Sequence, residues 1–528
     1  MISRRRLWIF VAAFLGIFTV GAIRLALRIP FTSDTLRKRV VETLSDRLDA
    51  EVELGDLTLR VLPALHAEGT DLRIRHKGRR DVPPLISIDK FTVDADLLGL
   101  WRKHVAHVNL DGLDIQIPPH DRDPDDHHER DARLENGDKD ADDGDWPERD
   151  VVIDELVADE ATLTILPRKA GKRPKVWQMH ELHMQSVGAL TKMPFRTELT
   201  NAVPPGQITT TGSFGPWKKV DPGLTPLDGI FTFENADLGV FKGISGILSA
   251  HGSYGGKLER IDVNGETDTP NFMVKISGHT VPLKTKYHAI VDGTNGDTTL
   301  ERIDATFLKT PLVAKGGVYD VEGVHGRLVT LDIDMPSGRL EDVMRLAVKT
   351  SQPPMTGGLR LHTKFDLPPG DVDVVDKLKL DGAFTIDEGR FTNAEVQQKI
   401  NGLSRRASAK ESEAAPQNVA SDFSGRFVLA DGQLALSTLT FKVPGALVEL
   451  SGHYSLTREA LAFNGSLFMD AKVSQTTTGW KSLMLKVVDP LFRKDGRTVI
   501  PIKISGTRNE PSFGMDVRRI FRRGDSKP

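Results

Sequence analysis

The sequence predicts a mainly β protein, in which an amino-terminal transmembrane helix is followed by an extended, curved antiparallel β-sheet. The sheet is expected to form an apolar groove and to carry a few short amphipathic helices. Two observations predict this class: apolar and polar residues alternate over many short segments, and 47 glycines and 30 prolines punctuate them. A third is the long uncharged run near the amino terminus.

Composition excludes several classes of protein. Lysine plus arginine (70) nearly balances aspartate plus glutamate (73), so the net charge does not indicate a nucleic-acid partner. The chain has no cysteine, which excludes disulfides, thiolate metal sites and cysteine nucleophiles. Only 39% of residues are hydrophobic and 6% aromatic, which is modest for large compact cores.

The first segment is a basic tail, 1–6, followed by a predicted transmembrane helix, 7–29. Leu7–Ile23 contains no charged residue, and about 20 residues span a bilayer if the flanking arginines reach the interface. The arginines before Leu7 favour a cytoplasmic amino terminus, which places the bulk of the chain on the other side. A cleaved signal peptide is the alternative.

Residues 30–119 are expected to form a helix and the start of the groove. Thr32, Ser33 or Asp34 can cap a helix that ends near Asp49, and alternating strands follow. In VNLDGLDIQI the alternation skips one position at Asp111-Gly112, as in a strand that bulges without ending. The residues predicted to line the groove are Val52, Leu54, Leu57, Leu59, Val108, Leu110, Leu113, Ile115 and Ile117.

Residues 120–150 are almost free of apolar side chains and heavily acidic, so they are predicted to be a disordered insertion. Because such a segment buries little surface, its deletion is expected to change thermal stability very little. The alternative is a metal-buffering loop that uses His120, His127 and His128. No fixed ligand spacing supports that alternative.

The middle of the chain, 151–392, shows a loose internal repeat. LERID occurs twice, and each copy is followed by a Thr-Pro pair, Thr269-Pro270 and Thr310-Pro311. PNFMVKISGH is similar to PGALVELSGH later in the chain, which suggests a unit of strand, proline turn, strand and glycine turn. One short helix is expected near 338–348, with Ser337 as its cap. A β-sandwich is the alternative to one continuous sheet.

Residues 393–420 are predicted to be a helix that ends in a polar loop, and 421–528 a second β region. Within the latter, 480–494 has the spacing of an amphipathic helix. Its apolar face is expected either to cover the sheet or to lie at a membrane interface. The predicted membrane-interface residues are Trp480, Leu483, Met484 and Val487.

No catalytic motif is recognisable, so we expect a protein that is not an enzyme and that has no cofactor or metal. HELHM, His180 to Met184, differs from the zinc-protease motif because its histidines are three residues apart rather than four. Alternation around Val176 to Met184 indicates a strand instead. Aspartate pairs such as Asp371 and Asp373 leave a hydrolase with two catalytic carboxylates as a less favoured alternative.

Three places in the chain resemble the AsmA-like family of Gram-negative envelope proteins. They are VELGDLTLRVLPALHAEGTDLRI after the first helix, FSGRFVLADGQLALSTLTFKVPGALVELSGHYSL with its turn at Asp431-Gly432, and VIPIKISGTRNEPSFGMD near the end. The last stretch is similar to the family's I-x-G-T-x-x-x-P-x-F strand pair through Ile504, Gly506, Thr507, Pro511 and Phe513. The acidic insertion departs from the family pattern.

The resemblance implies a bridge-like lipid-transfer protein that is anchored in the inner membrane through residues 7–29, with its bulk in the periplasm. Its groove would bind acyl chains, with phospholipid as the expected ligand, and would support lipid transport or outer-membrane assembly. Because the groove is expected to be shorter than a periplasm is wide, a partner protein or a second copy is predicted at its distal end. The alternative is an envelope scaffold or regulator with a self-packed sheet.

Overall fold

The structure is a computed structural model that describes residues 33–48, 50–60, 65–76, 83–117, 151–165, 175–188, 190–218, 222–321, 324, 326–408, 419–471, 493–494, 497–507 and 510–515. The expected basic tail, transmembrane helix and acidic insertion lie outside these residues, as do Trp480, Leu483, Met484 and Val487. Within the described ranges, none of the helices has the length and apolar character needed to span a bilayer.

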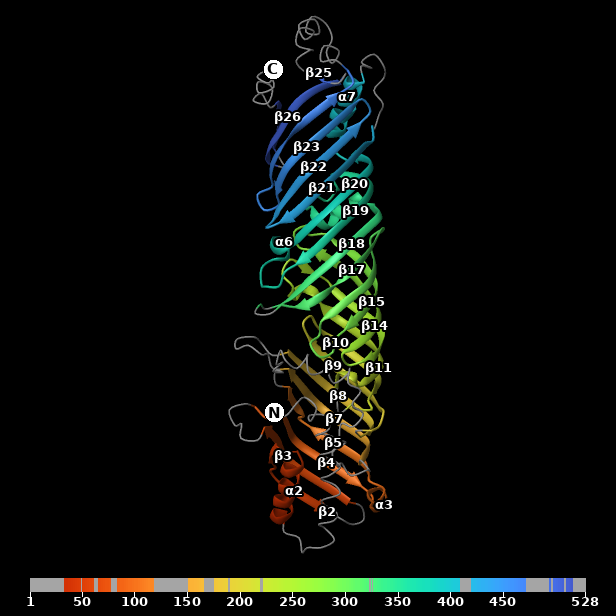
Figure 1. Ribbon diagram of the computed structural model, residues 1–528, viewed down its shortest axis with the longest axis vertical. Coiled ribbons are helices and arrows are strands. Elements are labelled where there is room, and N and C mark those ends of the chain that lie inside the picture. The colour runs from red at the N-terminus through yellow and green to blue at the C-terminus, as the bar shows by residue number, and fades with distance from the viewer. Residues whose placement is uncertain are drawn as a thin grey trace, which may run out of the picture. The chain divides into compact units, whose positions relative to one another are not determined.

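The strands belong to one mixed sheet, so the mainly β class is confirmed. The chain divides into two compact units, and the labelled elements of each can be found in Figure 1. Unit 1 comprises residues 1–236, 249–265 and 290–296, and unit 2 comprises 237–248, 266–289 and 297–528. Strands β13 (Ile247–Lys257), β14 (Arg260–Val274) and β15 (Thr280–Val291) are divided between the units.

Unit 1 begins with a helix and continues as a run of strands. The elements are α2 (Ser33–Leu48), β1 (Ala50–Glu53), β2 (Leu57–Arg60), β3 (Leu65–His76), β4 (Ile86–Ala95), α3 (Leu97–Trp101), β5 (His104–Asp111), β6 (Asp114–Ile117), β7 (Val152–Ile165), β8 (Lys175–Val187), β9 (Met193–Ala202), β10 (Pro205–Phe214), η1 (Pro222–Leu224) and β11 (Pro226–Asp237). From β7 to β11 each strand pairs antiparallel with the next.

The expectation of a wholly antiparallel sheet is wrong at one place in unit 1. Both β5 and β6 pair parallel with β7, with His104 opposite Val152 and Ile117 opposite Ile165. A parallel pair needs a long return connection, usually of a dozen residues or more. Residues 118–151, which include the acidic insertion, are that connection.

The skipped position predicted at Asp111-Gly112 divides one strand into two, β5 and β6, but the two parts keep the same neighbours. Gly112 has φ +66°, a left-handed conformation that glycine adopts without strain, and it separates β5 from β6. Both halves still pair with the same neighbours, β4 and β7. The earlier segment that contains Val52 is divided in the same way: β1 and β2 are separate strands, and both pair with β3.

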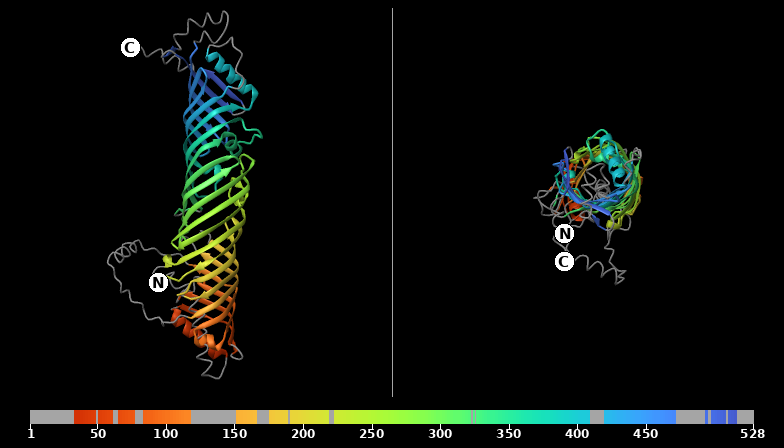
Figure 2. Two further views of the ribbon diagram at one scale, coloured as in Figure 1. Left: turned by 90° about the vertical axis from the view of Figure 1, so that its right-hand side faces the viewer. Right: turned by 90° about the horizontal axis from the view of Figure 1, so that it is seen from above.

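In its described residues, unit 2 is a meander of strands with a few helices. Its elements are η2 (Leu238–Val240), β12 (Ile244–Ser245), β16 (Thr298–Phe307), β17 (Thr310–Asp320), β18 (Arg327–Arg339), α5 (Leu340–Ala347), β19 (Met355–Leu367), α6 (Val374–Lys377), β20 (Lys379–Phe391), α7 (Ala394–Ala407), β21 (Ser421–Ala430), β22 (Gln433–Val443), β23 (Ala446–Ser455), β24 (Ala460–Met469), β25 (Arg493–Lys494), β26 (Arg497–Thr507) and β27 (Pro511–Met515). From β16 to β24 each strand pairs antiparallel with its successor, in chain order (Figure 2).

Several local expectations for unit 2 change in detail. The helix near 338–348 is α5, but Ser337 lies in β18, and the capping position Arg339 makes no side-chain capping bond. Thr269-Pro270 lies inside β14 rather than in a turn. Arg493–Lys494, the end of the expected 480–494 helix, forms strand β25 instead.

The tightest core belongs to unit 1. Val40 (5% exposed) and Leu44 (1%) of α2 belong to one buried cluster with side chains from strands β1 to β9. In β3, β4 and β5 the inward side chains Leu72, Val93 and Val108 are fully buried at 0% exposure. Helix α2 therefore packs its apolar face on β1 and β2, at one side of this core, as its helical spacing predicts.

Candidate functional site

The strands of unit 2 separate an apolar face from a polar face. Along β19, His362, Lys364 and Asp366 alternate with Leu361 and Phe365, so the two sets point to opposite sides of the sheet.

Opposite charges lie side by side on the polar face, both across neighbouring strands and along a single strand. Lys315 pairs in register with Asp332, which pairs in turn with Lys364. Arg302 donates two hydrogen bonds of 2.7 Å to Asp304, and these bonds lower the pKa of the carboxyl group. Opposite charges side by side on a sheet stabilise the strand pairing, and their exposure matches a solvated surface.

The apolar face contains one row of side chains that crosses nine strands in register. Each member lies opposite the next on the neighbouring strand. We call it the long apolar row; its members are Leu300, Gly316, Leu331, Phe365, Leu380, Leu429, Leu434, Tyr454 and Leu461.

The long apolar row is less buried than an ordinary core. Leu429 is 7% exposed, while the other large side chains of the row are only half-buried. In unit 1 the corresponding inward residues, such as Ile86 (1%) and Val93 (0%), have almost no contact with solvent. The row is therefore an apolar surface that the protein itself covers incompletely.

Two helices cover a different part of the same face. Helix α5 packs with Val343 and Met344 in a cluster around Met335 and Leu359. Helix α7 packs in a second cluster around Phe441, Val443 and Val448, and its Ser404 hydroxyl donates to the Pro444 carbonyl oxygen in the β22–β23 turn.

The sequence explains why α7 forms where it does. Its capping residue Asn393 accepts hydrogen bonds from the backbone N–H groups of Glu395 (2.9 Å) and Val396 (3.1 Å).

Among the described residues, the two helix-covered clusters contain no member of the long apolar row. The helices therefore leave the row open.

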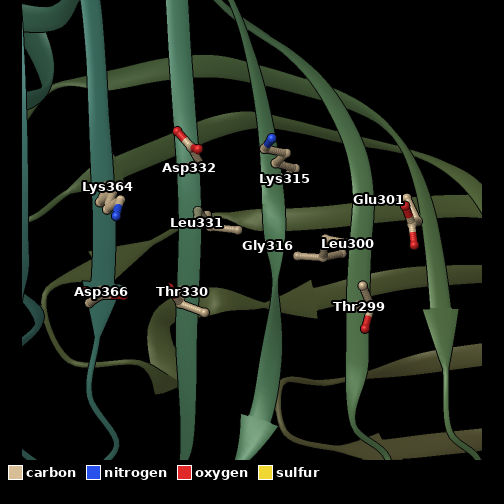
Figure 3. Close-up of a pocket in the computed structure, with 10 residues that line it drawn as sticks. All are labelled: Thr299, Leu300, Glu301, Lys315, Gly316, Thr330, Leu331, Asp332, Lys364 and Asp366. Atoms are coloured by element: carbon tan, nitrogen blue, oxygen red, sulfur yellow. The ribbon is translucent and has the colours of Figure 1, made fainter.

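A pocket of about 530 Å³ lies across β16 to β19, at one end of the row (Figure 3). Leu300 and Leu331 stand on either side of Gly316, which has no side chain to fill the space between them. Charged groups also line it, including Lys315 and Asp332, which belong to the polar face. Because so much of its lining is charged, the pocket does not match an acyl chain, and the candidate surface is the row itself.

The residues predicted to line the groove lie in unit 1, inside its packed core. The structure brings them together on one face: Val108 is 0% exposed, Leu110 and Ile115 2%, and Leu57 and Leu113 3%. The others are Val52 (5%), Leu54 (8%), Leu59, which is half-buried, and Ile117, which lies in β6 with its side chain outside the described set. The buried members of this set belong to one core cluster with α2, so their contact with lipid stays a prediction.

Sequence reasoning missed a row of histidines and carboxylates on the polar face of unit 1. His66 Nδ1 lies 2.6 Å from Asp94 Oδ1, and His107 Nδ1 lies 3.0 Å from Glu155 Oε2. Asp94 also pairs in register with His107, so these four side chains alternate across β3, β4, β5 and β7. The residues are far apart in sequence, and only the strand register brings them together.

The HELHM segment lies in strand β8, as its alternation predicts. His180 Nε2 is 2.7 Å from the Thr200 hydroxyl, and His183 Nε2 is 2.7 Å from Glu181 Oε1. Among the residues that the structure describes, no group of three histidine or carboxylate side chains is arranged to hold a metal ion.

Comparison with known proteins adds no assignment. No protein-family model matches the chain. No curated protein matches it either.

Proposed function

We propose that this chain is an inner-membrane-anchored periplasmic protein that binds lipid acyl chains along the apolar face of its sheet. In this role it would support phospholipid transport or outer-membrane assembly. The anchor is the uncharged run Leu7–Ile23, and the ligand is a membrane lipid, with phospholipid as the expected class. The proposal involves no chemical step.

One observation supports this proposal above the rest: the long apolar row is continuous in register across nine strands and is only half-buried. Neighbouring strands lie about 4.8 Å apart, so the row from Leu300 to Leu461 extends about 38 Å. One leaflet of a bilayer contributes roughly 15 Å of hydrocarbon, so the row exceeds the length of a single acyl chain.

The physical basis is burial of apolar surface without directional contacts. Each methylene removed from water by this face contributes about 0.8 kcal/mol. The leucine and phenylalanine side chains of the row offer similar contacts at successive strands. An acyl chain could therefore move along the row without being held in one deep energy minimum. The glycine at Gly316 interrupts the row with a small residue rather than a polar one.

A matched pair of variants tests the proposal. Leu434 belongs to the row, and the exposed Ala435 is its neighbour on the opposite face of β22. An unpaired carboxylate at Leu434 should weaken acyl-chain binding by more than about 1.4 kcal/mol, which corresponds to a tenfold loss of affinity. We expect Leu434→Asp to lose bound lipid and Ala435→Asp to retain it.

The measurement is mass spectrometry of solvent extracts from the purified full chain, with melting curves of the same samples. Wild-type protein should yield near-stoichiometric phospholipid after detergent controls are subtracted. Because Leu434 is half-buried, its variant should melt close to the wild type while its lipid signal falls. If wild type carries no lipid above the detergent blank, or if both variants lose lipid equally, the proposal fails.

The second candidate function is an envelope scaffold that binds no lipid. The closely packed core of unit 1 favours this function for unit 1. Its inward side chains contact one another so closely that Leu72, Val93 and Val108 are inaccessible to solvent. A scaffold built entirely in this way would carry no lipid in the same extraction. The experiment therefore separates the two candidates.

A further inference from the structure

The turn between β4 and β5 presents two large apolar side chains to solvent. It contains the short helix α3, and the carboxylate of Asp96 accepts a hydrogen bond from the backbone N–H of Gly99 at the start of the helix. Leu98 is 60% exposed and Trp101 83% exposed. Because these residues are three positions apart on a helix, their side chains share one face.

The residues around this pair suit the surface of a lipid bilayer. Tryptophan combines a large apolar ring with an N–H donor, and it is enriched where hydrocarbon meets headgroups. Arg102 and Lys103 follow directly, and the Arg102 side chain is exposed. Basic side chains beside an apolar anchor match the anionic headgroups of a bilayer.

Strand register shows that the chain enters unit 1 on the side that carries α3. Arg37 of α2 bonds the Gly55 carbonyl oxygen (3.2 Å), and Ser45 Oγ accepts from Val52 N–H (3.3 Å). Helix α2 therefore runs in the same direction as β3, and its first turn points towards the strand end where Leu65 pairs with Ala95, directly before α3. Figure 1 shows α2 and α3 at the same end of unit 1.

The length of chain before α2 limits how far this end can lie from a membrane. Residues 24–32 separate the uncharged run Leu7–Ile23 from Ser33. Fully extended, the ten steps from Ile23 to Ser33 reach at most about 36 Å. If Leu7–Ile23 spans the bilayer, the end of unit 1 with α3 must lie near the bilayer surface.

We propose that α3 is a second membrane contact, in which Leu98 and Trp101 insert into the headgroup region of the bilayer that holds the anchor. This inference rests on the anchoring part of the proposed function. A single spanning segment does not by itself fix the tilt of unit 1 relative to the bilayer. A second contact fixes how the start of the sheet faces the bilayer, and thereby where a lipid would enter.

The absence of cysteine from the chain makes a direct test simple. Leu98→Cys in the full chain carries a unique thiol for a nitrobenzoxadiazole fluorophore. Ile230→Cys is the matched control, because Ile230 is 64% exposed and lies within strand β11 of the same unit. Each labelled protein is reconstituted into vesicles of phosphatidylethanolamine and phosphatidylglycerol, with and without lipids that carry a nitroxide near the headgroup.

We expect both proteins to float with the vesicles. The probe at Leu98 should emit at shorter wavelength than the probe at Ile230, and the nitroxide lipid should remove about half of its emission or more, because an interfacial side chain lies within about 10 Å of the headgroups. The Ile230 probe should be unaffected. Replacing Trp101 by serine in the Leu98→Cys background should reduce the quenching without changing the melting temperature.

The other outcomes overturn the inference in distinguishable ways. Flotation without quenching at Leu98 rejects the α3 contact and leaves the anchor intact. Failure to float removes the anchor from the proposed function, and the α3 contact with it. Equal quenching at Leu98 and Ile230 means that unit 1 lies flat on the bilayer, which contradicts a contact confined to α3.

Discussion

Deletion of the acidic insertion should disrupt unit 1, although its composition alone suggests that it is dispensable. The reason is the parallel pairing of β5 and β6 with β7. Ile117, at the end of β6, lies opposite Ile165 at the end of β7, yet the chain must next return to Val152 at the start of β7. Thirteen residue steps separate Val152 from Ile165, and at about 3.3 Å per step the return distance is about 43 Å.

The variant lacking Asp121 to Glu148 cannot cover that distance. Only residues 118–120 and 149–151 remain between Ile117 and Val152, and seven extended steps reach about 25 Å. Either β5 and β6 or the start of β7 must therefore leave the sheet, which exposes core residues such as Val108 and Ile153, each 0% exposed. Full exposure of each such side chain costs about 1.5–3 kcal/mol.

The assay is thermal unfolding of the full chain, followed by circular dichroism, for the deletion and for a control in which glycine and serine replace the same residues at equal length. Loss of several core side chains amounts to 5 kcal/mol or more, and should lower the melting temperature of unit 1 by more than about 10 °C. The control should melt near the wild type. A series of shortened linkers should recover stability at about 13 residues. A deletion variant as stable as wild type would show that the parallel register is wrong.

Three further predictions follow from other parts of the chain. Ile115→Asp places a carboxylate in the core of unit 1, where Ile115 is 2% exposed, and should destabilise it by about 4–5 kcal/mol or more, whereas Gln116→Asp should cost under about 1 kcal/mol by denaturant titration. Burial raises the pKa of Tyr254 and Tyr287 above the ordinary 10.0, so their contribution to stability is complete below pH 10.0 and is lost as pH rises through the folded-state pKa values; alkaline titration of tyrosinate absorbance should lag behind that of the unfolded chain. A reporter enzyme fused after Pro528 should be active only outside the cytoplasm, and cytoplasmic activity would contradict the arginine-based orientation.

The sequence predicts individual elements well because their signals are local. The helical spacing from Ala394 onward indicates α7, and the alternation around Val176 to Met184 indicates β8. Strand partners are a different matter, because register depends on residues far apart in the chain. The parallel step at β7 and the pairing of His107 with Glu155 follow from that register, so neither could be read from the sequence.

The burial of the candidate surface could not be predicted from the sequence either. Alternation identifies apolar faces on the strands of both units, but burial depends on what packs over each face. The face that includes Leu110 and Ile115, two of the predicted groove residues, belongs to one buried cluster that extends from α2 through strands β1 to β9. Leu331 and Leu434 have the same alternating pattern, and they are half-buried because α5 and α7 pack elsewhere. The apolar faces of unit 1 and unit 2 therefore share the same strand pattern. Only what packs over each face distinguishes them.

The chain-order meander of unit 2 also bears on how such a protein can fold and change in length. From β17 to β23 each strand bonds to the one before and the one after it, so every new strand finds its partner already in place when the chain emerges amino terminus first. Pairing of near neighbours keeps loop-closure entropy small and favours rapid folding. Stability then accumulates roughly strand by strand, as in repeat proteins. Duplication of one hairpin would lengthen the sheet by about 10 Å without altering any existing register, and such a step gives evolution a simple way to set its length.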